Sequence, residues 1–105
     1  MTRPSRLDDA VVEEWLATHS TWRRHEDHLI RELRTRDYAS GVAIVQAQVE
    51  IADRLDHHPK AIVGYREVRL ELCTHDRGSL TQLDLEYAEA FDAMLTSDFA
   101  NVIVE

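Results

Sequence analysis

The sequence lacks what several common classes of protein require. It contains one cysteine, Cys73, so no disulfide can form within the chain. Its three glycines and two prolines argue against a long disordered segment. No stretch approaches the roughly 20 apolar residues that a membrane-spanning helix needs. The N-terminal part has no apolar run behind basic residues, so we expect no signal peptide and a soluble, cytoplasmic protein.

Basic residues are also scarce, twelve against twenty acidic ones, which gives a formal net charge of −8. Duplex DNA would repel such a domain unless its cations were clustered. The densest basic group is interrupted by Glu26, Asp27 and Glu32. We therefore predict a solvated face of mixed charge and no direct binding of nucleic acid. The members of this group are Arg23, Arg24, Arg31, Arg34 and Arg36.

The length of 105 residues, with 44% hydrophobic and 30% charged residues, is typical of one folded domain. A chain of this size buries roughly two-thirds of its unfolded surface, so packing against a second subunit would add stability. We treat residues 1–105 as a single domain with its core over about 7–95. The tail 97–105 stays unassigned, because Val102 and Val104 fit either a short strand or a frayed end.

Three segments show the spacing of helices. Ser5 can cap the first and Asp37 the second, which must end by His58 because proline disfavours a helix at the residue before it. Thr81 begins the third, and Asp84 follows three residues later in a variant of the capping box. The expected apolar faces are Leu7, Val11 and Trp15; Val42, Val45, Val49 and Ala52; and Ala88, Phe91 and Leu95.

Between the helices, alternation of apolar and polar residues predicts four strands. A turn at 25–28 would join the first two, and the fourth keeps its apolar residues on one face, as half-buried antiparallel strands do. We therefore expect an α+β fold in the order α-β-β-α-β-β-α, a four-stranded antiparallel sheet with three helices packed on one face. The expected strands cover 21–24, 29–35, 61–65 and 68–74.

Three of the six histidines stand where predicted elements end. His57 and His58 close the second helix, and His75 follows the fourth strand. A free imidazole titrates near pH ~6.5, so two such rings can act as base and acid in one reaction. Elimination of water needs such a pair. Carboxylates at Asp53 and Asp56 would favour the charged form of a ring that they touch.

These residues alone leave other interpretations open. Adjacent histidines at a helix C-terminus also fit a solvated end, where the dipole favours a cation. Zinc is a third interpretation, although the HExxH spacing is absent. Cys73 fits a small strand filler better than a nucleophile. Trp22 fits either a core position or a wall for a flat heteroaromatic ligand.

A longer pattern narrows the choice. The run Asp-Arg-Leu-Asp-His-His-Pro, from Asp53 to Pro59, resembles the signature of the pterin-4a-carbinolamine dehydratases. That signature continues with an aromatic, a histidine and an aspartate, and Tyr65, His75 and Asp84 follow at matching intervals. The resemblance extends over roughly residues 7–95. Its upstream matches are Trp22, Leu29, Arg31, Leu33, Asp37 and Tyr38.

The resemblance implies an enzyme that converts 4a-hydroxy-tetrahydrobiopterin to quinonoid dihydrobiopterin and water, with no metal or organic cofactor. It recycles the pterin that aromatic amino acid hydroxylases use. His57, His58 and His75 would be catalytic, and Asp53 would orient or charge one of them. Asp84 is assigned to capping the last helix. The resemblance also implies a homodimer or homotetramer. With the three histidines, the residues lining the pterin pocket would be Asp56, Cys73, Thr74 and Asp76.

The sequence departs from the family pattern at Ala61, Arg77 and Ser79, which border the expected pocket. Some relatives serve instead as non-catalytic dimerisation or assembly modules for a protein partner, which is the main alternative function. A metal-dependent hydrolase using the same histidines is another. Neither a dimerisation module nor an assembly module needs a complete set of histidines, so the complete set favours the dehydratase.

Overall fold

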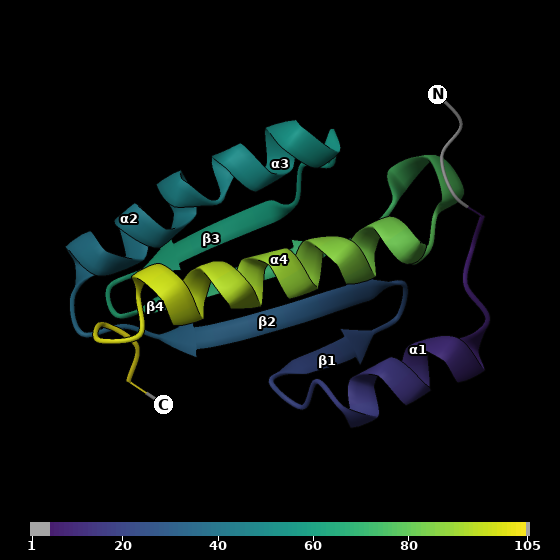
Figure 1. The fold of residues 1–105 in the computed structure, drawn as a ribbon, viewed down its shortest axis with the longest axis horizontal. Coiled ribbons are helices and arrows are strands. Elements are labelled where there is room, and N and C mark those ends of the chain that lie inside the picture. The colour runs from purple at the N-terminus through teal and green to yellow at the C-terminus, as the bar shows by residue number, and fades with distance from the viewer. Residues whose placement is uncertain (1–4, 105) are drawn as a thin grey trace.

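The computed structural model describes residues 5–104, apart from the side chain of Asp76, and has the predicted α+β architecture. Four antiparallel strands lie in the order β1-β2-β4-β3, and the helices pack on one face of the sheet (Figure 1). No helix within this described part is long and apolar enough to cross a membrane. The elements are α1 (Asp9–Ala17), β1 (Trp22–His25), β2 (His28–Arg34), α2 (Tyr38–Ala47), α3 (Val49–Leu55), β3 (Lys60–Gly64), β4 (Glu67–Leu72), the 3-10 turn η1 (His75–Arg77) and α4 (Gln82–Asp98).

The sheet separates an apolar face from a charged one. The buried side chains of paired strand residues face the helices. Examples are the pairs Leu29–Leu72 and Leu33–Val68. The predicted strands are confirmed, with ends that shift by one or two residues, and the β1–β2 turn is shorter than expected. On the opposite face the side chains form ion pairs instead, one exposed and one half-buried. These are Arg23 with Glu32 at 2.7 Å and Arg69 with Glu71 at 2.8 Å.

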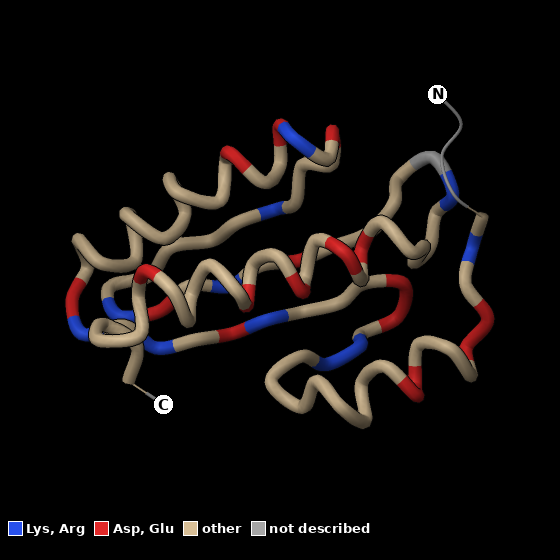
Figure 2. Tube along the Cα trace, viewed as in Figure 1, with Lys and Arg blue, Asp and Glu red and all other residues tan. Residues whose placement is uncertain are grey.

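Helix α4 begins as predicted. The Thr81 hydroxyl accepts a hydrogen bond from the Leu83 N–H at 3.2 Å, and the Asp84 carboxylate accepts one from the Thr81 N–H at 2.9 Å. Its expected core residues are buried, with Phe91 at its centre. Figure 2 shows that α4 carries acidic residues and no lysine or arginine. Arg31 on the sheet beneath it lies 3.7 Å from Asp92 of this helix.

The middle helix differs from the prediction in two ways. It is divided at Gln48 into α2 and α3, although Asp37 caps it as expected by accepting from the Ser40 N–H at 2.8 Å. The expected apolar face is wrong for Val42 and Val49, which are 41% and 46% exposed, whereas Val45 and Ala52 contact the core as expected. A Cβ on Gly41 would lie 3.3 Å from Val68, so the helical segment meets the sheet along Gly41 and its neighbours one to three turns later. Those neighbours on the inner face are Ile44, Gln48, Ile51 and Ala52.

The first helix starts later than predicted. Arg6 forms a bridge with Thr81, and the Leu7 N–H donates to the Leu80 carbonyl at 2.9 Å. These bonds hold the segment extended, so α1 begins at Asp9 rather than after Ser5. The helix consequently buries Val12 and leaves Val11 43% exposed, so the expected apolar face is wrong at Val11. Leu7 and Trp15 contact the core as expected.

The expected solvated arginine face is wrong for one member. Arg31 is only 6% exposed and lies beneath α4. Alternate residues of a strand face the same side of the sheet, so Arg31 faces the core with Leu29 and Leu33 of β2. Trp22, which pairs with it in the β1–β2 register, is a core residue at 3% exposure.

The C-terminal tail continues the pairing of β2, since the Val104 N–H donates to the Arg34 carbonyl at 2.9 Å.

Candidate active site

The turn after α3 places His57 inside the protein. Helix α3 ends at Leu55, and Asp56 takes a left-handed conformation with φ 48° and ψ 48°. The His57 N–H then donates back to the Ala52 carbonyl at 2.9 Å. This reversal turns the His57 side chain toward α4 and leaves it 5% exposed. The solvated helix end that the sequence left open therefore does not describe this histidine.

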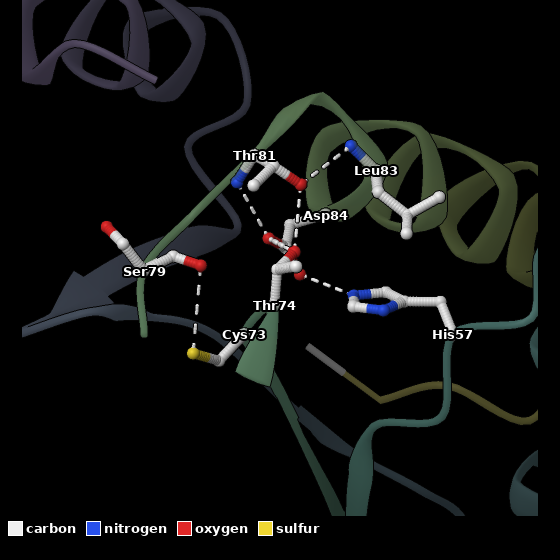
Figure 3. A network of polar contacts seen from close by, with 7 residues as sticks. All are labelled: His57, Cys73, Thr74, Ser79, Thr81, Leu83 and Asp84. Carbon is white, nitrogen blue, oxygen red and sulfur yellow. Dashed lines mark hydrogen bonds and ion pairs between the residues drawn. The ribbon is translucent and has the colours of Figure 1, made fainter. Parts of the chain in front are cut away.

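The buried His57 ring meets the first turn of α4. Its Nε2 lies 2.6 Å from Oδ1 of Asp84, whose side chain is fully buried (Figure 3). The other Asp84 oxygen accepts from the Thr81 N–H at 2.9 Å and from the Thr74 hydroxyl at 2.8 Å. The Asp84 carboxylate thus joins three segments: the end of α3, the end of β4 and the start of α4. A charge buried this deeply persists only when such donors surround it.

The hydroxyl chain behind Asp84 fixes the direction of each proton. The Thr74 hydroxyl donates to Asp84, so the Thr81 hydroxyl, 2.8 Å from it, donates to Thr74. The Thr81 oxygen is in turn the acceptor for Leu83. Because Asp84 is surrounded by donors, the His57 Nε2 carries a proton toward it. In the neutral ring, Nδ1 is then the basic nitrogen.

His58 occupies a different environment from its neighbour. Its Nε2 lies 3.1 Å from Oδ1 of Asp53, and both side chains are well exposed, at 61% and 68%. Water screens such a pair, so it contributes little stability. His75 is also exposed, at the start of η1. Gly78 closes that turn with φ 59°, a conformation that glycine adopts readily.

The remaining predicted pocket residues lie around this network. Thr74 belongs to it directly, and Asp56 forms the exposed turn before His57. Cys73 is buried, and its thiol donates toward the Ser79 carbonyl at 3.8 Å. Burial raises the pKa of the Cys73 thiol, with the Asp84 charge adding to the effect, so the group stays neutral and is not an activated nucleophile. The side chain of Asp76 lies outside the described part.

The structure places the predicted residues in three groups: His57 and Thr74 both bind the Asp84 carboxylate, His58 binds Asp53, and His75 lies on η1. Sequence reasoning missed the second role of Asp84, to which it gave capping alone. It also missed Thr81 as part of the chain of hydroxyls. The spacing of Asp84 after His75 was the signal that could have indicated the role of Asp84 as a partner of His57. Among the described side chains, no group of three or more His, Cys, Asp or Glu could hold a metal ion.

Comparisons with known proteins found a matching family and similar structures. The family model described as pterin 4 alpha carbinolamine dehydratase matches residues 5–94. A protein of the same family name from Natronomonas pharaonis is 36% identical, over 85% of this chain and 95% of its own length. One from Metallosphaera sedula is 34% identical, over 85% of this chain and 93% of its own length. A Brucella melitensis structure titled transcriptional coactivator/pterin dehydratase has a TM-score of 0.80 and 25% identity, covering 86% of this chain and 98% of that one. A pterin dehydratase-like protein titled as a RuBisCO assembly factor has a TM-score of 0.61 and 22% identity over 76% and 95%, which shows the fold alone.

Proposed function

Because the chain belongs to the pterin 4 alpha carbinolamine dehydratase family, we propose that it dehydrates 4a-hydroxy-tetrahydrobiopterin to quinonoid dihydrobiopterin and water, in the recycling of tetrahydrobiopterin. One observation carries the proposal. His57 is buried with its Nε2 held 2.6 Å from Asp84, so its Nδ1 is the nitrogen left to exchange a proton with a substrate. A buried imidazole oriented by a carboxylate is a common arrangement for acid–base catalysis.

The reaction requires one proton to be given and one to be taken. An acid protonates the 4a-hydroxyl, and the C4a–O bond breaks with its electron pair on the departing water. The N5 lone pair then forms the C4a=N5 double bond while a base takes the N5 proton. Two imidazoles of the set His57, His58 and His75 perform these transfers. Asp53 orients His58 through their 3.1 Å contact.

We place the pterin ring beside the turn before His57 and the segment that leads into η1. Asp56 lies on the first, and Cys73 and Thr74 end the second, with Asp76 within η1. The neutral Cys73 thiol adds no charge there. Polar groups of the backbone suit the hydrogen-bonding edge of a pterin. No step of this reaction calls for a metal or an organic cofactor.

The direct test follows the absorbance of 4a-hydroxy-tetrahydropterin that a phenylalanine hydroxylase generates in situ. Wild-type protein is expected to accelerate its decay, and His75→Ala to lower kcat/KM about 100-fold, as loss of one acid–base group does. His75 is exposed, so the variant should fold. The matched control is His25→Ala, an exposed histidine on β1 with a 65% exposed side chain. No acceleration by folded wild type would reject the proposed reaction, and equal activity of both variants would remove His75 from it.

We also propose that the chain forms a homodimer or homotetramer through the outer face of α2 and α3. Tyr38, Val42 and Val49 lie on these helices and are 53%, 41% and 46% exposed. Apolar side chains repeated along one helix face, away from the core, are typical of a surface that packs against another chain. A second copy offers the same face, so the two can pack symmetrically.

Val42→Asp is expected to weaken self-association at least about tenfold, because a carboxylate would lose its water in the interface. Light scattering after size exclusion, across a dilution series, measures the effect. Val11→Asp is the control, since Val11 is 43% exposed on α1 and lies outside the proposed surface. A mass distribution that is the same for both variants would show that α2 does not form the interface.

A second candidate function is a non-catalytic dimerisation or assembly module that docks a protein partner on the same face of α2 and α3. The exposed apolar residues there favour it as a docking surface. This second function predicts that the three histidines can be replaced together without loss of partner binding. It also predicts that Val42→Asp abolishes partner binding. The dehydratase predicts the opposite for the histidines, so one set of variants separates the two.

A further inference from the structure

Tyr87 contacts His57, one of the proposed catalytic histidines, inside the protein. It lies on α4 one turn after Asp84, and it is fully buried. Its ring meets the His57 ring edge to face, with centroids 6.1 Å apart and planes at 68°. Such a contact favours one orientation of each ring. Two side chains of α4 therefore hold His57: Asp84 at Nε2 and Tyr87 against the ring.

The hydroxyl of Tyr87 reaches a second point on the same segment. It donates to Gln48, contacting the side-chain carbonyl and lying 3.3 Å from the backbone oxygen. Gln48 is 7% exposed and stands at the junction where α2 ends and α3 begins. Burial raises the pKa of Tyr87, so the hydroxyl remains a neutral donor. The phenol is thus a rigid connection between the junction and the His57 ring.

Helix α3 is consequently held by α4 at both ends. Tyr87 binds Gln48 just before α3, and Asp84 binds His57 just after it. The same helix carries Asp53, the partner of the exposed His58. A shift of α3 along α4 would move both histidines together and would lengthen the contact between His57 and Asp84. Displacements of about 1 Å at a catalytic group reduce rates by orders of magnitude.

We propose that Tyr87 is a positioning residue for the dehydration: through its hydroxyl it fixes α3 against α4, and through its ring it fixes the plane of His57, so that Nε2 stays on Asp84 and Nδ1 stays aimed at the substrate. This inference rests on the proposed function for its kinetic consequences. The Tyr87 hydroxyl, rather than the bulk of its ring, fixes α3 against α4. A purely space-filling residue would not need the hydrogen bond to Gln48.

The test uses two variants and a control. Tyr87→Phe keeps the ring and removes the hydrogen bond, and it leaves the buried Gln48 amide without its donor. Tyr87→Phe with Gln48→Leu removes both polar groups, which restores stability because no buried acceptor is left unpaired. Leu95→Val is the control: Leu95 is a buried core residue of α4, about 16 Å further along the helix than Asp84 by the rise per residue.

Tyr87→Phe is expected to lower kcat about tenfold with KM changed less than about twofold, since substrate contacts persist while proton transfer is misaligned. The double variant should regain its melting temperature and keep the low kcat. In proton NMR the His57 Nε2–H resonance should move or broaden in both variants and stay in place in Leu95→Val.

Recovery of kcat together with stability in the double variant would overturn the inference, as would an unchanged kcat and His57 resonance in Tyr87→Phe. The NMR signal does not depend on turnover. If wild type proves inactive as a dehydratase, the proposed function fails while the resonance still reports whether Tyr87 positions the ring.

Discussion

Asp84→Asn is expected to fold normally and to lose about three orders of magnitude in kcat/KM. One Asp84 oxygen accepts both the Thr81 N–H and the Thr74 hydroxyl. An asparagine keeps only one acceptor oxygen, and these two donors hold it in that place. Its NH₂ group then faces the His57 Nε2, where the carboxylate oxygen stood. The imidazole must accept that hydrogen bond, so its proton moves to Nδ1 and the ring presents the wrong tautomer to the substrate.

The same absorbance assay measures the loss, and circular dichroism with a thermal scan checks the fold. The capping hydrogen bond from Thr81 survives in asparagine, so the melting temperature should fall only slightly. Asp53→Asn is the matched control, because it alters an exposed carboxylate–histidine pair by the same chemistry. We expect that variant to lose about tenfold or less, since water screens the pair. Equal losses in both variants would show that burial of the His57–Asp84 pair is not what matters.

The local signals in the sequence predicted most of the fold. The capping box at Thr81, the cap at Asp37 and the stop at Pro59 each depend on residues within a few positions, and the structure contains all three. The alternation in β4 is likewise local. Each signal reflects how a backbone satisfies its own hydrogen bonds, which a single sequence records well.

The apolar face of the middle helix could not be decided by periodicity, because that helix carries two apolar stripes. Val42 and Val49 lie on one and Ile44 and Ile51 on the other. Both have helical spacing, and only packing against the sheet distinguishes them. Gly41 marks the inner stripe, since the close approach to Val68 leaves no room for a larger residue without displacement. A glycine inside a helix was therefore the available signal.

The site was predicted by residue type but not by contact. His57 and Asp84 are 27 positions apart, and nothing local in either segment indicates that one carboxylate caps a helix and binds an imidazole. The capping interpretation was correct and incomplete. Arg31 illustrates the same limit. Its charge suggested a solvated position, whereas it lies on the same face of β2 as Leu29 and Leu33 and is therefore buried.

Replacing Arg31 or Asp92 alone is expected to lower the free energy of unfolding by about 3 kcal/mol, and the melting temperature by about 15 °C. Arg31 Nε lies 3.7 Å from Asp92 Oδ1, and the Trp22 indole N–H donates to the other Asp92 oxygen at 2.8 Å. Arg31→Leu leaves the Asp92 carboxylate, which belongs to the acidic helix α4, without the Arg31 cation (Figure 2). Asp92→Leu leaves a guanidinium in the core.

The double variant Arg31→Leu/Asp92→Leu should return close to wild type, because apolar residues can replace a buried pair at little cost. Urea denaturation of the four proteins gives the coupling free energy directly. Arg23→Ala is the control, since its pair with Glu32 is about half exposed and should be worth less than about 1 kcal/mol. Losses that simply add in the double variant would mean that the two side chains stabilise the fold independently.

The same pair predicts a dependence of stability on pH. Burial raises the pKa of Asp92 above its ordinary value of 3.8, although the Trp22 indole and Arg31 oppose the shift. The native state therefore holds this proton more tightly than the unfolded chain, so the contribution is fully present below pH 3.8 and is lost as pH rises through the folded pKa. Asp92→Asn removes this titration. The unfolding free energy of wild type minus that of Asp92→Asn should thus fall as the pH rises above the ordinary pKa of 3.8. Glu32, whose pKa Arg23 lowers, has the opposite sign and cancels in the difference. A difference that stays flat, or rises with pH, would show that Arg31 outweighs burial at this carboxylate.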